Sequence, residues 1–222
     1  MTKFLLLFDL DGTLVDTLPD LTSALNEVLR EQGHAPLLPA EVKPMIGDGM
    51  PMLLRRGFAA RGVEAAEAMA VQSRFIEIYE AHATNASRPY PGVPETLAAL
   101  RAAGYATGVC TNKPHHATGA VLRELGLDGL FDGYAGGDRF AVRKPDAGHL
   151  LGLVEALGGD PRRAAMIGDS ENDALSARAA KLPLILMRYG YARIDPAALG
   201  PDRLLDRFAE LPAALDAMGL NP

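Results

Sequence analysis

Residues 3–14 read KFLLLFDLDGTL, a run of large apolar side chains that leads into two aspartates, Asp9 and Asp11, and a glycine. Polar residues do not alternate within the segment Lys3–Phe8, which is typical of a strand buried on both faces of a parallel sheet. Asp9 follows that segment directly. The sequence therefore predicts a buried first strand with two carboxylates on the turn at its carboxyl end.

Three further apolar runs predict strands, and helical patterns follow them. The runs cover Tyr105–Cys110, Ala164–Ile167 and Leu182–Met187, and the helical patterns cover Pro114–Leu125, Ser170–Ala180 and, less clearly, the stretch after Arg188. Strands that alternate with helices form βαβ units. We therefore expect an α/β fold built on a doubly wound parallel sheet, with a Rossmann-like core.

The pattern changes between Leu18 and Pro89, where apolar residues recur at helical spacing and no strand-like run interrupts them. A first helix is expected to end at Gly33, and further helices are expected over Met50–Ala60, Ala65–His82 and, past this region, Val93–Ala103. We expect residues 1–16 and 90–222 to form the α/β core domain. Residues 17–89 are expected to form a helical cap domain inserted after the first strand.

The composition is that of a globular protein and excludes several kinds of partner. The 222 residues include 22 Lys and Arg against 28 Asp and Glu, a formal net charge of -6 without a long basic run, which argues against nucleic acid as a partner. The apolar run at the N-terminus is too short for a signal segment or a membrane span, so no membrane association is expected. A single cysteine, Cys110, suits a reducing compartment, and we expect a cytoplasmic location. Monomer and homodimer both remain open.

Polar residues gather where the predicted strands end and in one nearby loop. They are Asp9, Asp11, Thr111, Asn112, Lys144, Asp169 and Asp173. In open parallel sheets the reactive crevice lies beyond the carboxyl ends of the strands. Crowded carboxylates raise one another's pKa, so a multivalent cation is their natural partner, and a set of oxygen ligands suits Mg²⁺. A lysine and a hydroxyl beside the metal form a pocket for a dianion, which predicts a phosphorylated substrate.

Four motifs in this order resemble those of the haloacid dehalogenase superfamily of phosphohydrolases. They are DLDGT at residues 9–13, Thr111, Lys144-Pro145, and GDSEND at residues 168–173. Within the superfamily, shorter stretches such as IGDG at residues 46–49 and TNKP at residues 111–114 are most similar to bacterial phosphoglycolate phosphatases. The resemblance implies a hydrolase that acts on a small phosphorylated metabolite, most closely phosphoglycolate.

The resemblance also implies a role for each residue of the motifs. Asp9 would be the nucleophile that forms an aspartyl-phosphate, and Asp11 the general acid and base. Thr111, the backbone N–H of Asn112 and Lys144 would bind the phosphate. The implied ligands of Mg²⁺ are Asp9, Asp11 (through its backbone carbonyl), Asp169 and Asp173, the last either directly or through water. A second interpretation of Asp173, as an acid that complements a helix N-terminus, is compatible with the first.

Other activities of the same superfamily remain open from the sequence. A pyrophosphatase, a nucleotidase and a phosphosugar mutase would use the same pair of aspartates, and a catalytically silent binding module would keep the fold alone. Haloacid dehalogenation is disfavoured, because that reaction has no use for a second acid at Asp11. Residues that choose the substrate are expected in the helical insert, with Gly47, Asp48 and Gly49 and the basic pair Arg55 and Arg56 as candidates.

Overall fold

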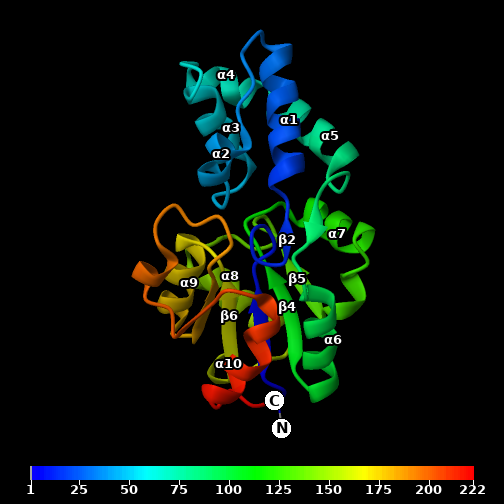
Figure 1. Cartoon of the computed structure of the whole chain (residues 1–222), viewed down its shortest axis with the longest axis vertical. Helices are drawn as coiled ribbons and strands as arrows, with labels where there is room; N and C mark the ends of the chain where they lie inside the picture. Colours follow the sequence, from blue (N-terminus) through cyan, green and yellow to red (C-terminus); the bar gives the residue numbers. More distant parts are fainter. Residues whose placement is uncertain (1) are drawn as a thin grey trace.

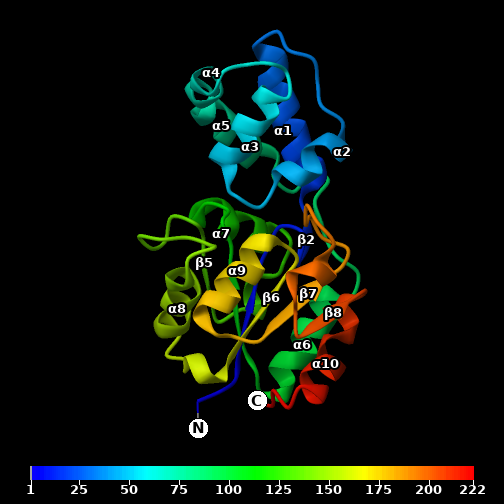
Figure 2. The ribbon, with the colours of Figure 1, turned by 90° about the vertical axis from the view of Figure 1, so that its left-hand side faces the viewer.

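A computed structural model describes residues 2–222; Met1, the first residue of the predicted core domain, lies outside the described part. Six parallel strands form the main sheet, in the order β5-β4-β1-β6-β7-β8 (Figures 1 and 2). They are β1 (Leu5–Phe8), β4 (Ala106–Cys110), β5 (Gly133–Ala135), β6 (Ala164–Gly168), β7 (Leu184–Met187) and β8 (Arg203–Leu205). The predicted parallel α/β fold is confirmed, and its four predicted strands are present. The strands β5 and β8 lack a long apolar run and were not predicted.

Helices cover both faces of the sheet. The side chains of β1 are apolar on both faces, so each face has to be shielded from water. Leu6 and Phe8 pack into one core cluster and Leu5 and Leu7 into the other. The helices are α6 (Val93–Ala103), α7 (His115–Glu124) and α10 (Leu211–Ala217) beside the first cluster, and α8 (Ala147–Ala156) and α9 (Glu171–Ala180) beside the second. Figure 1 shows α6 and α7 on one side of the sheet and α8 and α9 on the other.

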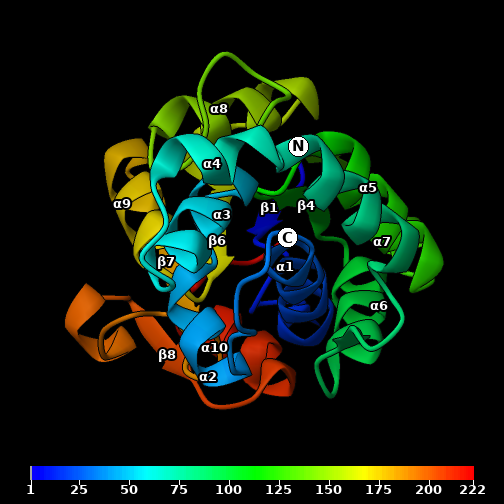
Figure 3. The ribbon, with the colours of Figure 1, turned by 90° about the horizontal axis from the view of Figure 1, so that it is seen from above.

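A separate layer of helices lies over the carboxyl ends of the strands (Figures 1 and 3). It comprises α1 (Leu18–Glu31), α2 (Pro39–Val42), α3 (Met50–Ala59), α4 (Ala65–Ala70) and α5 (Gln72–His82). The single helix predicted over Ala65–His82 is two, because the chain leaves helical geometry at Val71. Short 3₁₀ turns occupy Lys43–Met45, Asp128–Leu130, Pro161–Arg163, Pro196–Leu199 and Phe208–Glu210. Among the helices of residues 2–222, none combines the length and the apolar character that crossing a bilayer requires.

The helix expected directly after Arg188 is absent from the described chain. Residues 188–195 form a loop that leads to the 3₁₀ turn Pro196–Leu199. Two tyrosines explain the loop conformation. The Tyr189 hydroxyl donates to the Thr13 carbonyl at 2.7 Å, and the Tyr191 hydroxyl accepts from the Thr17 backbone N–H at 2.9 Å. These contacts hold the segment over the strand ends.

Two short strands connect the helical layer to the sheet. Val15–Asp16 (β2) pairs with Arg88–Pro89 (β3) in antiparallel fashion, so the chain enters and leaves the layer through one narrow neck. Asp20, buried in the first turn of α1, reinforces this neck. Its carboxylate accepts from the backbone N–H groups of Ala86 (3.0 Å) and Ser87 (2.7 Å) and from the Ser87 hydroxyl (2.6 Å).

Replacement of Asp20 by alanine is predicted to destabilise the protein by about 2–4 kcal/mol, because it leaves buried donors at Ala86 and Ser87 without an acceptor. Urea unfolding measures the change. The matched control is Asp216→Ala, which removes an exposed carboxylate from α10 and should change the free energy of unfolding by less than about 0.5 kcal/mol. Equal effects of the two substitutions would show that Asp20 does not hold the neck.

Candidate active site

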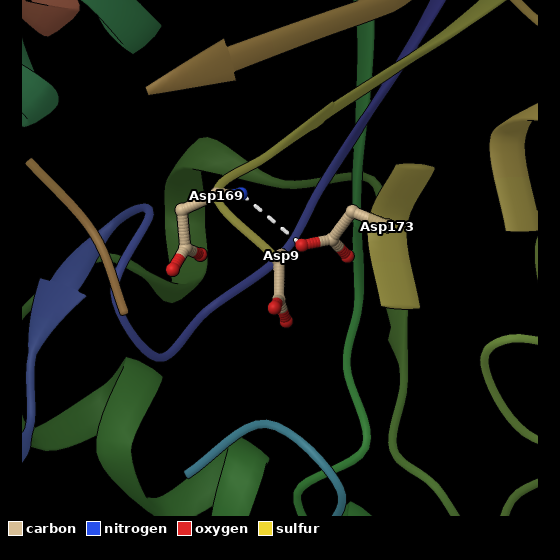
Figure 4. Close-up of side chains that lie close together, drawn as sticks. All are labelled: Asp9, Asp169 and Asp173. Carbon is tan, nitrogen blue, oxygen red and sulfur yellow. Dashed lines mark hydrogen bonds between the residues drawn. The ribbon is translucent and has the colours of Figure 1, made fainter. Parts of the chain in front are cut away.

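The topology of the sheet brings together residues that lie far apart in the sequence. Asp9 follows β1, Thr111 follows β4 and Asp169 follows β6, and β1 lies between the other two strands. Asp9, Asp169 and Asp173 each offer a carboxylate oxygen within 4.8 Å of the other two, and all three are buried. In Figure 4 the three side chains project toward a common space.

Lys144 neutralises part of this negative charge. Its side chain is 1% exposed, and its ammonium lies 3.0 Å from Asp9 Oδ1 and 2.6 Å from Asp173 Oδ1. Burial acts to lower the pKa of Lys144, but the charges of Asp173 and Asp9 outweigh burial and the pKa is raised. The ammonium therefore stays charged, orients the Asp9 carboxylate and favours its ionised form.

Asp173 joins Lys144 to the start of α9. Its Oδ2 accepts from the backbone N–H groups of Asp169 (3.1 Å) and Ser170 (3.0 Å) and from the Ser170 hydroxyl (2.7 Å), and Oδ1 accepts from Lys144. Figure 4 draws the bond from Asp169 to Asp173. Both oxygens are thus engaged by donors, and the expected complement to a helix N-terminus is present.

The charged forms of the other two carboxylates, Asp9 and Asp169, are disfavoured. Burial raises the pKa of Asp9 to about 7, although the Lys144 ammonium acts in the opposite direction. The pKa of Asp169 is raised well above its usual range, by burial first and then by the charges of Asp173 and Asp9. Its oxygens accept from the Thr13 hydroxyl and the Tyr191 backbone N–H, each at 2.6 Å. The residues that could hold a cation are therefore Asp9 and Asp169, with Asp173 beside them.

Asp11 lies on the cavity side of the turn and has a partner that the motif analysis did not assign to the site. The Lys113 ammonium is 3.1 Å and 3.3 Å from the two Asp11 oxygens. The Lys113 side chain is only 2% exposed, and its ammonium lies 4.5 Å from the centre of the Tyr79 ring. Burial acts to lower the pKa of Lys113, but Asp11 and Tyr79 outweigh it and the pKa is raised. The sequence signal was its place in the stretch TNKP at residues 111–114, for which the motif analysis assigned no role to the lysine.

Thr111 and Asn112 are buried at the end of β4, as the motif positions require. The Asn112 amide donates to the Gly47 carbonyl at 2.9 Å and to the Lys144 carbonyl at 3.0 Å. It therefore ties a loop of the helical layer to the loop that carries Lys144. The Asn112 side-chain oxygen is buried and has no partner within residues 2–222.

The residues proposed from the helical insert divide into two groups. Gly47 and Gly49 line a cavity together with Asp9 and Asp11, whereas Arg55 is exposed on α3. Asp48 anchors the same loop: it accepts from Asn172 (2.6 Å) and pairs with Arg56 (2.5 Å) and Arg193 (2.7 Å). The charge of Arg56 is therefore already engaged by Asp48.

His149 supports the loop that carries Lys144, and nothing in the sequence pattern marked it. Its ring is buried in α8; Nδ1 accepts from the Lys144 backbone N–H at 3.3 Å and Nε2 faces the Gly136 carbonyl at 3.1 Å. These contacts require a neutral ring protonated on Nε2. Burial and the Lys144 charge lower the pKa of His149 to about 4.

His149 should make stability depend on pH. Between pH 6.5 and 4 the unfolded chain binds a proton at this residue and the folded protein does not, so stability is lost as the pH falls through this window. From neutral pH to about pH 5, wild type should lose about 2 kcal/mol more than His149→Gln in urea unfolding. His116→Gln, which removes an exposed histidine, is the control and should follow wild type. Parallel curves for wild type and His149→Gln would contradict the assignment of a neutral ring.

Comparison with known proteins agrees with this geometry. A model of the haloacid dehalogenase-like hydrolase family matches residues 5–181. A phosphoglycolate phosphatase of Agrobacterium fabrum is 45% identical over 213 residues, which cover 95% of this chain and 91% of that protein. A phosphoglycolate phosphatase of Caulobacter vibrioides is 44% identical and covers 93% of this chain and 88% of its own length.

Solved structures lead to the same group of proteins. A crystal structure described as a predicted phosphoglycolate phosphatase from Haemophilus somnus has a TM-score of 0.90 and 33% sequence identity, and covers 96% of this chain and 98% of its own. The resemblance inferred from the motifs is thereby confirmed. Because the family model spans most of the sequence and the relatives cover nearly all of it, the chain belongs to the haloacid dehalogenase-like hydrolase family.

Proposed function

We propose that this protein is a Mg²⁺-dependent phosphatase that hydrolyses 2-phosphoglycolate through an aspartyl-phosphate formed on Asp9. The phosphatase class follows from the family and from relatives of 44–45% identity that are named phosphoglycolate phosphatase. One observation carries the mechanism: the buried Asp9 carboxylate, held at 3.0 Å by Lys144, lies at the end of the central strand and lines the same cavity as Asp11.

The donor set fits magnesium. Asp9 and Asp169 supply carboxylate oxygens close enough to share one ion, and the backbone carbonyl of Asp11 is the further ligand that the family resemblance implies. Hard oxygen ligands of this kind suit Mg²⁺, which keeps several waters and completes its shell with substrate oxygens. When bound, the ion would neutralise charge on the transferring phosphoryl group. Asp173 is engaged by Lys144 and by α9, and its proposed role is to hold these groups in place.

The proposed reaction has two displacements at phosphorus. An oxygen of Asp9 attacks, the bond to the leaving oxygen breaks, and Asp11 donates a proton to that oxygen. Water then attacks the phosphoryl group, Asp11 accepts its proton, and the bond to Asp9 breaks to release phosphate. Thr111, the Asn112 backbone N–H and Lys144 would donate to the phosphoryl oxygens in both steps.

Residues 17–89 are proposed to act as a cap domain over a core of residues 1–16 and 90–222. The support is the narrow neck between β2 and β3 and the contribution of Ile46, Gly47, Gly49 and Met50 to the cavity that contains Asp9. Movement at the neck would admit substrate, and closure would exclude water from the reaction.

A pyrophosphatase and a nucleotidase differ from this proposal in the leaving group, and a phosphosugar mutase differs in the acceptor, because a sugar hydroxyl replaces water in its second step. A pyrophosphatase, a nucleotidase and a phosphosugar mutase would use Asp9 and Asp11 in the same way, and no contact in the cavity favours any of them. The catalytically silent module is set aside, because the chain belongs to a hydrolase family and its relatives are phosphatases.

Asp9→Asn is predicted to lower kcat for phosphate release by about 10⁴-fold or more, because an amide oxygen is a poor nucleophile. The variant should remain folded, since asparagine has the same shape and Lys144 keeps its contact with Asp173. Circular dichroism checks the fold, and the exposed Asp216→Asn serves as the control with wild-type activity. Substantial turnover by a folded Asp9→Asn protein would assign the nucleophile elsewhere.

Removal of metal with EDTA is predicted to abolish phosphate release, and added Mg²⁺ should restore it. Asp169→Asn should raise the Mg²⁺ concentration needed for half-maximal activity by about 10- to 100-fold, because one carboxylate ligand is lost. The shift in melting temperature on addition of Mg²⁺ should shrink in the same variant, which reports binding independently of turnover. Full activity of the metal-stripped wild type would refute the magnesium proposal.

A further inference from the structure

The cavity beside Asp9 is lined by a cation, Lys113, to which the proposed function assigns no part in phosphate binding. Its polar lining consists of Asp9, Asp11, Thr111, Asn112 and Lys113, and apolar side chains of the helical layer complete it. Among the residues that line the cavity within the described chain, Lys113 is the one cation. We propose that Lys113 selects the substrate, by pairing with a carboxylate of the leaving group.

The buried cations of the site are not equivalent. Lys144 lies between two carboxylates, at 3.0 Å from Asp9 and 2.6 Å from Asp173, and in the proposed reaction it also donates to the phosphoryl group, so its three N–H donors are all assigned. Within residues 2–222 Lys113 forms an ion pair with one carboxylate, that of Asp11, and its ammonium has three N–H donors. An ammonium with one carboxylate partner in a buried cavity is a favourable site for a second carboxylate.

The position of Lys113 beside Asp11 indicates that the second anion is a carboxylate of the leaving group. The proposed function requires Asp11 to contact the oxygen that leaves with the substrate carbon. In 2-phosphoglycolate the carboxylate is one methylene carbon away from that oxygen. Because the Lys113 ammonium is 3.1 Å from Asp11, a leaving oxygen that contacts Asp11 brings the carboxylate within reach of Lys113. This inference therefore rests on the proposed function and names the group that recognises its substrate.

The surroundings of Lys113 strengthen the pairing. Leu21, Met50 and Leu53 form an apolar wall of the cavity, which reduces the screening of charges by water. The Tyr79 ring lies 4.5 Å from the ammonium and favours its charged form. The Tyr79 hydroxyl is buried and has no partner within residues 2–222, so it is a further donor available beside the ammonium. α5 of the helical layer thus contributes to the recognition of the carboxylate.

A pair of substrates separates recognition from chemistry. Ethyl phosphate resembles 2-phosphoglycolate but has a methyl group in place of the carboxylate. Wild type should prefer 2-phosphoglycolate, and Lys113→Met should lower kcat/KM for 2-phosphoglycolate by about 100-fold or more relative to ethyl phosphate. Lys113→Arg should keep part of the preference, because the charge remains. Arg55→Met removes an exposed positive charge from the helical layer and should leave the ratio unchanged.

The outcomes distinguish failure of this inference from failure of the proposed substrate. Equal losses on both substrates in Lys113→Met would show that Lys113 serves Asp11 alone, and would overturn the inference while the substrate stands. A wild type without preference for 2-phosphoglycolate over ethyl phosphate would overturn the proposed substrate itself. Thermal melting of Lys113→Met and its activity on ethyl phosphate together verify that the variant is folded.

Discussion

The buried ion pairs of Lys144 are the interaction on which the site depends. Asp9, Asp169 and Asp173 could not share one small volume as anions without a cation among them. The ammonium, 3.0 Å from Asp9 and 2.6 Å from Asp173, supplies part of that charge before substrate or metal arrives. It also links the central strand to α9. Since the desolvation of such groups opposes folding, these buried ion pairs are not expected to add much to stability.

Hydrogen bonds and ion pairs also connect the sheet to the helical layer. Tyr191 donates from its backbone to Asp169 and from its hydroxyl to Asp16 in the neck, each at 2.6 Å. Asp48 accepts a hydrogen bond from the side chain of Asn172, the second residue of α9. These contacts connect Asp169 and the start of α9 to the neck and to the helical layer. The contacts of Asp48 with Asn172 and Arg193 hold this loop of the helical layer against the strand ends.

Much of the fold could be predicted from the sequence, and so could the grouping of the motif residues near the strand ends. Long apolar runs such as Lys3–Phe8 are a strong signal, because a strand buried on both faces has no polar residues. The strands β5 and β8 were missed because three residues without such a run carry too little pattern. The loop after Arg188 was misinterpreted because tertiary hydrogen bonds of its tyrosines determine its conformation. His149 lies in no motif, and Lys113 lies in the TNKP stretch but acquires its role from Asp11, which is distant in the sequence.

The central claim is that Asp9 carries the phosphoryl group during turnover. The most direct measurement is peptide mass spectrometry of a reaction with 2-phosphoglycolate that is quenched in acid during the first turnovers. The account predicts one added phosphoryl group on the peptide that contains Asp9, and its loss on treatment with hydroxylamine, as expected of an acyl phosphate. Modification of a different residue, or phosphate release without any labelled peptide at the earliest times, would contradict the account.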